Sequence, residues 1–347
     1  MIKSVHSNSV QPNVENNKKI KTRNKGIIRA NMAQGLMAFP ATAASVGVIA
    51  GMRKAAKVGY EDNISIKKAV SETLTNTGLR DAGVKVSFVN QPKKLPKSIN
   101  GFVDLFKNII DNPSKSDLKV METISNELKA DFDKNKLKKA YFEKLLKIDS
   151  DSLFAGELSK KIKSLPYFIQ FKLGINAAFL PNVNQIVVPD KALSVSAFHE
   201  MGHAMNANFS KVGKFLQQNR KIAMIAAPAI ALVAICTKKK VSEPKSEKKI
   251  QQAKDFVKRN AGKLSFLAFA PVLIEEAMAS LKGNKMAKMV LSPELLKKVK
   301  MTNALGFSSY LLAAATTGLT TMLAVKIKDN IQEKHEQKRL LKAQKNS

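Results

Sequence analysis

The hydropathy pattern divides the chain into charge-free apolar stretches separated by lysine-rich segments. A helix that crosses a bilayer needs about 20 apolar residues, so only the first and last stretches are long enough by themselves. We expect transmembrane helices at 32–52 and near the end of 283–325. The two shorter stretches fit tilted spans, a re-entrant pair or buried helices equally well. The four stretches are 30–52, 222–237, 264–274 and 302–325.

Between the first two stretches the pattern predicts helices and one strand. The run Gln185-Ile186-Val187-Val188 is β-branched and is closed by Pro189, which indicates a strand that ends just before the next helix. That helix is expected over 192–206, with Ser194 or Ser196 as its cap. The fold class is therefore mainly α with a small β element, an α+β arrangement in a polytopic membrane protein with helical spans. Earlier helices are expected near 65–74, 99–110, 116–132 and 137–146.

The same boundaries predict the domain organisation. The order is a basic leader (1–31), a transmembrane helix (32–52) and a water-facing region that contains the strand and the helix just described (53–221). An apolar helical hairpin with a basic loop follows (222–282), then a linker and transmembrane helix (283–325), and a charged tail (326–347). The 347 residues, 44% of them apolar, are enough for a sizeable core.

The charge balance is strongly basic, with 59 Lys and Arg against 27 Asp and Glu and a formal net charge of +32. Such a charge raises nucleic acid as a partner. The lysines, however, are spread along the chain and crowd beside apolar stretches, as in proteins that face anionic headgroups. We therefore predict a lipid bilayer and no nucleic acid as partner, in a multi-pass protein of a bacterial cell membrane. The oligomeric state and the side of the membrane that carries the site stay open.

The residues that carry chemistry lie in His199-Glu200-Met201-Gly202-His203. On a helix, His199 and His203 are at i and i+4, so both imidazoles lie on one face and can bind a single zinc ion. Glu200 lies on the flank of that face, where it can act as general base toward an attacking water. Three fixed positions in five also recur by chance, but the preceding strand and the presence of only four histidines favour a Zn²⁺ site.

A hydrolytic zinc site needs a third protein ligand. The extended motif with a third histidine is absent, because Asn206 and Phe209 occupy the places of its glycine and histidine. A later glutamate is therefore expected, and the pair Glu275-Glu276 follows an apolar helical run. We predict Glu276 as the ligand because small residues at plus three and plus four let a second helix pack closely, and Glu275 remains the alternative.

These motifs resemble the active-site region of the integral-membrane gluzincin peptidases, which include the CAAX prenyl proteases and the bacterial heat-shock membrane endopeptidases. The resemblance implies a zincin-like fold with a zincin-like catalytic region at 53–221. It also implies a zinc metalloendopeptidase that acts on protein or peptide substrates. It implies His199, His203 and Glu276 as metal ligands, Glu200 as the catalytic base, and the strand near Val187 as a docking edge for substrate. The matching segments are Asn176–Phe179, Gln185–Val188, His199–His203 and Glu276–Ala279.

Two departures from the family pattern bear on catalysis. Ser280 stands where the family often has an aspartate that orients a zinc-binding histidine. No downstream histidine or arginine offers itself as an oxyanion stabiliser, since His335 lies in the charged tail and Tyr310 in an apolar helix. The alternative function is therefore a non-catalytic basic membrane scaffold that binds anionic lipids or acidic partners.

Overall fold

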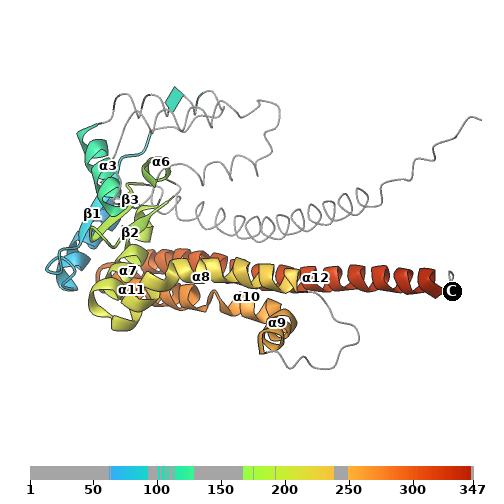
Figure 1. Ribbon diagram of the computed structural model, residues 1–347. Helices are drawn as coiled ribbons and strands as arrows, with labels where there is room; N and C mark the ends of the chain where they lie inside the picture. Colours follow the sequence, from blue (N-terminus) through green and yellow to red (C-terminus); the bar gives the residue numbers. More distant parts are fainter. Residues whose placement is uncertain are drawn as a thin grey trace, which may run out of the picture.

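The computed structural model describes residues 62, 64–92, 101, 104–105, 108, 112, 114–128, 167–174, 176–191, 193–237 and 249–344. Within them the protein is mainly helical with one small sheet, as predicted (Figure 1). The predicted leader 1–31, the transmembrane helix 32–52 and the helix 137–146 lie outside the described residues. The helix near 65–74 is confirmed and covers 64–76.

The sheet has three strands in the order β1-β3-β2, with β3 (Gln185–Pro189) in the middle. β1 (Lys85–Val89) runs parallel to β3, and β2 (Ala178–Leu180) runs antiparallel to it. The predicted strand at Gln185 is confirmed, and every residue of β3 is buried. The strand near Val187 is not a docking edge: that prediction is wrong, because β3 is paired along both of its sides.

Helices cover both faces of the sheet. Helix 64–76 and α7 (Ala197–Phe209) pack with Ile186 and Val188 in one core. α3 (Lys115–Leu128) and α6 (Tyr167–Lys172) pack with Val187 in a second core on the opposite face. The side chains of β3 alternate between these two buried faces. The strand is therefore a continuous apolar run.

The motif helix α7 begins later than predicted. A 3-10 turn at Ser194–Ser196 precedes it, and Ser196 occupies the cap position without a capping bond from its side chain. Ser194 instead donates its hydroxyl to the carbonyl of Lys191. The tight turn fixes the direction in which α7 leaves the sheet.

Five helices follow α7 among the described residues from 211 to 344. The boundary predicted at 221/222 falls inside α8, where the helix is bent by 43° between its two halves. The linker predicted from residue 283 is replaced by helix: α11 continues to residue 290, and α12 starts three residues later. The predicted charged tail belongs to α12 as far as residue 344, where the described residues end. The helices are α8 (Lys211–Cys236), α9 (Lys249–Arg259), α10 (Ala261–Leu267), α11 (Ala270–Val290) and α12 (Pro293–Gln344).

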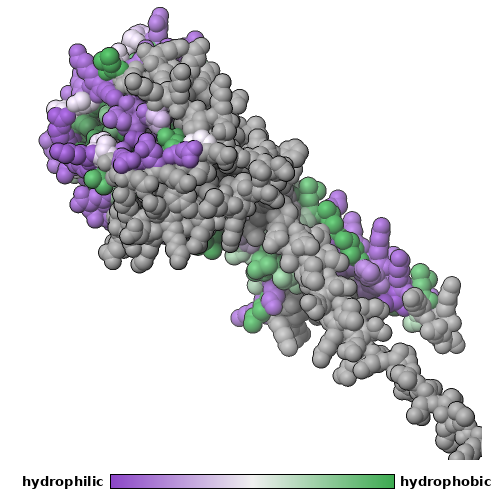
Figure 2. Space-filling view, turned by 90° about the horizontal axis from the view of Figure 1, so that it is seen from above, coloured by the Kyte–Doolittle hydropathy of each residue, from purple (hydrophilic) through white to green (hydrophobic). Residues whose placement is uncertain are grey.

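Two of the described helical segments are long and apolar enough to cross a membrane, Ala261–Val290 and Pro293–Leu341, and the bent α8 would be a third if it counts as one span. Only 33% of the apolar window of each segment is buried. Large apolar side chains such as Ile274, Leu319 and Leu323 are exposed along these segments, a pattern that suggests association with a membrane. Hydrophilic residues gather instead at the left end of Figure 2, where residues 64–92 and α3 lie in Figure 1.

α7 and α11 approach each other closely because each has a glycine at the crossing. A Cβ on Gly202 would lie 2.0 Å from the carbonyl oxygen of Ala279, and a Cβ on Gly283 would lie 2.5 Å from that of Phe198. No side chain fits at either point. The backbones of the two helices are therefore in direct contact beside the HExxH motif.

Replacing Gly202 by alanine tests this contact. An added methyl group must push α11 away, so we expect Gly202→Ala to lower the free energy of unfolding by about 1–3 kcal/mol or more. Thermal unfolding in detergent measures the change. Gly306→Ala in α12 is the matched control, since a Cβ there meets nothing within 4 Å. Alanine favours a helix over glycine by about 1 kcal/mol, so the control should be neutral or stabilised, and equal destabilisation of both variants would contradict the packing argument.

Candidate metal centre

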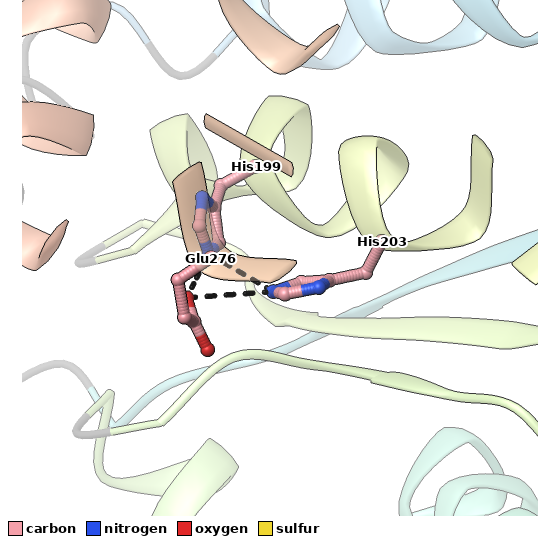
Figure 3. A group of neighbouring side chains, drawn as sticks. All are labelled: His199, His203 and Glu276. Carbon is pink, nitrogen blue, oxygen red and sulfur yellow. Dashed lines mark hydrogen bonds and ion pairs between the residues drawn. The ribbon is translucent and has the colours of Figure 1, made fainter. Parts of the chain in front are cut away.

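The three residues predicted as metal ligands lie together. His199 and His203 extend from α7 and Glu276 from α11, and Figure 3 shows the three side chains pointing toward one another. The two Nε2 atoms are 3.0 Å apart. Oε2 of Glu276 lies 3.1 Å from Nε2 of His199 and 3.8 Å from Nε2 of His203. Within the described part of the chain, these residues form the group that could hold a metal ion.

The spacing of these donor atoms fits a tetrahedral metal. Zinc binds imidazole nitrogen and carboxylate oxygen at roughly 2.0–2.2 Å, so two donors on a tetrahedral ion are roughly 3.3 Å apart. The observed separations of 3.0, 3.1 and 3.8 Å bracket that value. Two nitrogens and one oxygen also make a three-ligand set of the kind found in catalytic zinc sites, which leaves a fourth position open.

Glu275, the alternative ligand, has a different place. Its Oε1 lies 2.7 Å from Nδ1 of His203, on the side of the ring away from the metal-facing nitrogen. The same oxygen accepts hydrogen bonds from Asn206 at 3.2 Å and from Gln217 at 2.9 Å. Glu275 is fully buried. A carboxylate in this position orients the imidazole and raises its basicity toward a metal.

Ser280 supports the other imidazole. Its hydroxyl lies 3.2 Å from Nδ1 of His199, so each histidine has a polar partner on the nitrogen that faces away from the centre. Ser280 and both glutamates come from α11, at the crossing with α7. A neutral hydroxyl is a weaker partner than the aspartate that the resembling family often has here.

Arg220 and Tyr310 complete the surroundings of the carboxylates, a role that the sequence did not predict for either residue. Arg220, from α8, forms ion pairs with Glu276 Oε1 and, at 3.3 Å, with Glu275 Oε2. It also donates to the Tyr310 hydroxyl at 3.1 Å, and its guanidinium lies 5.3 Å from the centre of that ring. No local pattern marked Arg220, because it lies 55 residues from Glu275 and 90 from Tyr310 in the sequence.

Glu200, the predicted base, is anchored to the sheet. Its Oε2 accepts a hydrogen bond of 2.8 Å from the backbone N–H of Phe179 in β2. The residue is buried, with 7% of its surface exposed. This bond orients the carboxylate on the flank of the histidine face and links it to the outer side of β2.

The acidic surroundings change the protonation of His203. Burial lowers the pKa of its imidazole, but the hydrogen bond with Glu275 and the charges of Glu276, Glu275 and Glu200 outweigh burial and raise the pKa to about 9. Without a metal, His203 is therefore protonated at neutral pH. Its proton balances part of the negative charge of the two buried glutamates.

Comparison with known proteins adds no identification: no protein-family model matches the chain, and no curated protein and no solved structure matches it. The likeness to the gluzincin peptidases therefore stays a prediction from the motifs.

Glutamine substitutions separate the roles of the two glutamates. Glu276→Gln should abolish stoichiometric metal binding, because it replaces a charged donor by a weak neutral one. Glu275→Gln should keep one site per chain but lower its affinity about 10–100-fold, since only the partner of His203 is changed. Metal analysis and competitive titration with a chelator measure both quantities. The opposite ranking would make Glu275 the ligand.

The raised pKa of His203 predicts that metal binding depends on pH. A protonated imidazole has no free lone pair, so the metal must displace the proton, and about one proton per metal should be released at neutral pH. Affinity should then rise about tenfold per pH unit until the pH reaches the pKa of about 9. Calorimetry in buffers of different ionisation enthalpy counts the protons. An affinity that is constant between about pH 6 and 8 would contradict the assignment.

Proposed function

We propose that the protein is a membrane-embedded, zinc-dependent endopeptidase that hydrolyses peptide bonds of membrane or membrane-proximal proteins. The observation that carries the proposal is the convergence of His199, His203 and Glu276 at donor distances suited to zinc, with Glu200 beside them on the same helix. A motif helix packed against a small sheet, with the candidate third ligand on a later helix, supports the proposal of a zincin-like arrangement.

The protein's own residues account for positioning and proton transfer. Bound zinc would supply a Lewis acid that polarises the scissile carbonyl and makes water a better nucleophile. Glu200 takes the proton of the attacking water and delivers it to the leaving amine. The Phe179 N–H holds one oxygen of Glu200, which leaves the other oxygen for this transfer. Arg220 compensates the charge of the glutamates and keeps Glu276 in place.

β2 offers the docking edge that β3 does not. Phe179 pairs opposite Ile186, and its N–H points to Glu200 rather than to β3. In an antiparallel pair the N–H and the C=O of one residue point the same way, so the carbonyl of Phe179 also faces outward. A substrate backbone added to this edge in extended form would pass beside Glu200.

The apolar helices support a membrane location for the site. Glu276 belongs to the helical segment Ala261–Val290, which is apolar and long enough to span. A peptide bond reaches such a centre most readily when it lies in or near a bilayer. We extend the proposal to a multi-pass arrangement in which α8 and α10–α11 form the predicted hairpin, returning Glu276 to His199.

Glu200→Gln tests the proposal directly. Loss of the base should lower proteolysis of a casein-type substrate about 10²–10⁴-fold, while about one zinc per chain is retained. His199→Ala should lose both the metal and the activity. The matched control is Glu72→Gln, at an exposed position of helix 64–76, which should change neither.

Two outcomes would refute the proposal. One is wild-type protein that is folded but binds no zinc. The other is proteolysis that persists in Glu200→Gln. Zinc binding without any proteolysis would favour a non-catalytic membrane scaffold instead.

A further inference from the structure

The sheet has a second open edge, on β1, at the far side of the sheet from Glu200. The N–H of Lys85 binds the carbonyl of Asn184, and the N–H of Asp190 binds the carbonyl of Val89. In a parallel pair, alternate residues direct both backbone groups to the neighbour. Lys85, Ser87 and Val89 therefore face β3, and the N–H and C=O groups of the two residues between them face outward. No strand among the described residues pairs with them.

This edge forms the floor of a cleft of about 770 Å³, which we call the β1 cleft. One wall is a face of helix 64–76, with lining residues spaced one helical turn apart. The other wall is a face of α3 with the same spacing. The lining residues are Lys67, Val70, Ser71 and Leu74 from the first wall, Lys119, Glu122, Thr123 and Asn126 from the second, and Arg80, residues 83–88 and Gln185 between them.

The β1 cleft is basic on both walls. Its lining contains four cations, Lys67, Arg80, Lys85 and Lys119, against the single acid Glu122. Lys67 is partly engaged, since its ammonium lies 3.8 Å from Asp190 and 5.3 Å from the centre of the Phe88 ring. The other three cations are exposed and form no ion pair with a described residue.

The cations lie on both sides of the strand. Phe88 is on the side of helix 64–76, beneath Lys67. Ser87 is on the side of α3, because it accepts from Gln185, which in turn accepts from Thr123. Lys85 shares the Ser87 side, since side chains two apart on a strand point the same way. The side chains of an added strand would point alternately to these two sides, so both sets would meet positive charge.

We propose that the β1 cleft binds an extended, acidic peptide segment of a partner protein by strand addition. The outward backbone groups of Val86 and Phe88 supply up to four hydrogen bonds to the peptide backbone. The cations select Asp and Glu side chains at neighbouring positions. A five-residue strand is about 17 Å long, so the site takes a segment of about five residues. The proposal does not depend on the metal centre, because the two open edges lie on opposite sides of β3.

Peptide binding to the full-length Glu200→Gln protein in detergent tests this inference without cleavage. The probe is a fluorescein-labelled peptide of alternating Glu and Val or Thr, and anisotropy measures its affinity. A peptide with Lys in place of Glu has the same strand propensity but the wrong charge. A third peptide, the acidic one with every backbone nitrogen methylated, keeps the charge but offers no N–H group on either edge and cannot form the ladder.

We expect the acidic peptide to bind at least about tenfold more tightly than either of the other two, and less tightly as salt rises. The double substitution Lys85→Glu/Lys119→Glu, added to Glu200→Gln, should weaken binding of the acidic peptide about tenfold or more relative to Glu200→Gln alone. The matched control, Lys249→Glu/Lys254→Glu in α9, removes as much charge at exposed positions outside the cleft and should leave the affinity unchanged.

Three results would overturn strand addition at this site. Equal binding of the methylated peptide would mean that charge alone holds it. An equal loss in the α9 control would mean that net charge, not the cleft, is responsible. Binding of phosphatidylserine vesicles that is lost in Lys85→Glu/Lys119→Glu, with no peptide binding, would mean that the basic walls contact a membrane.

Discussion

The direct backbone contact between α7 and α11 is the constraint on which the rest of the site depends. Gly202 lies against the backbone of Ala279, and Gly283 against that of Phe198, so the two helices are as close as backbone contact allows. At this distance the side chains of α11 reach both imidazoles of α7 from the side. Glu276 meets the Nε2 atoms, while other residues of the same helix meet the Nδ1 atoms. One helix crossing thereby supplies the third donor and both orienting partners.

This crossing places two carboxylates in the interior, which would be costly if they were uncompensated. Glu275 and Glu276 are 0% and 1% exposed. A buried charge is tolerated when it is paired and hydrogen-bonded. Arg220 from α8 reaches both carboxylates, and its contact with Tyr310 of α12 ties a further helix to the centre. The charges of the site therefore depend on helices that contribute no ligand, and the apolar helices and the polar centre are one structural unit.

Two parts of the described structure differ in the polarity of their surfaces. The helices beyond α7 expose apolar side chains along segments long enough to span, whereas the surface around β1 is hydrophilic and basic. The small sheet lies between the two. Its β2 edge faces Glu200 and its β1 edge faces the basic cleft, so a single buried strand, β3, positions both open edges. The strand β3 thus positions both the β2 edge beside Glu200 and the candidate docking surface at the β1 cleft.

The sequence alone determined what depends on local periodicity. The helical repeat places His199 and His203 on one face, and the β-branched run before them forms β3. The charge-free stretches indicated the apolar helices, and small residues after Glu276 indicated a close packing partner.

The tertiary structure decided what depends on long-range contacts. It brought Glu276 to His199 across 77 residues, directed Glu275 to the far nitrogen of His203, and recruited Arg220. It also paired β3 on both sides, which moved the open edges to β1 and β2. Such contacts leave no mark at fixed spacing, because they arise only when distant helices and strands pack.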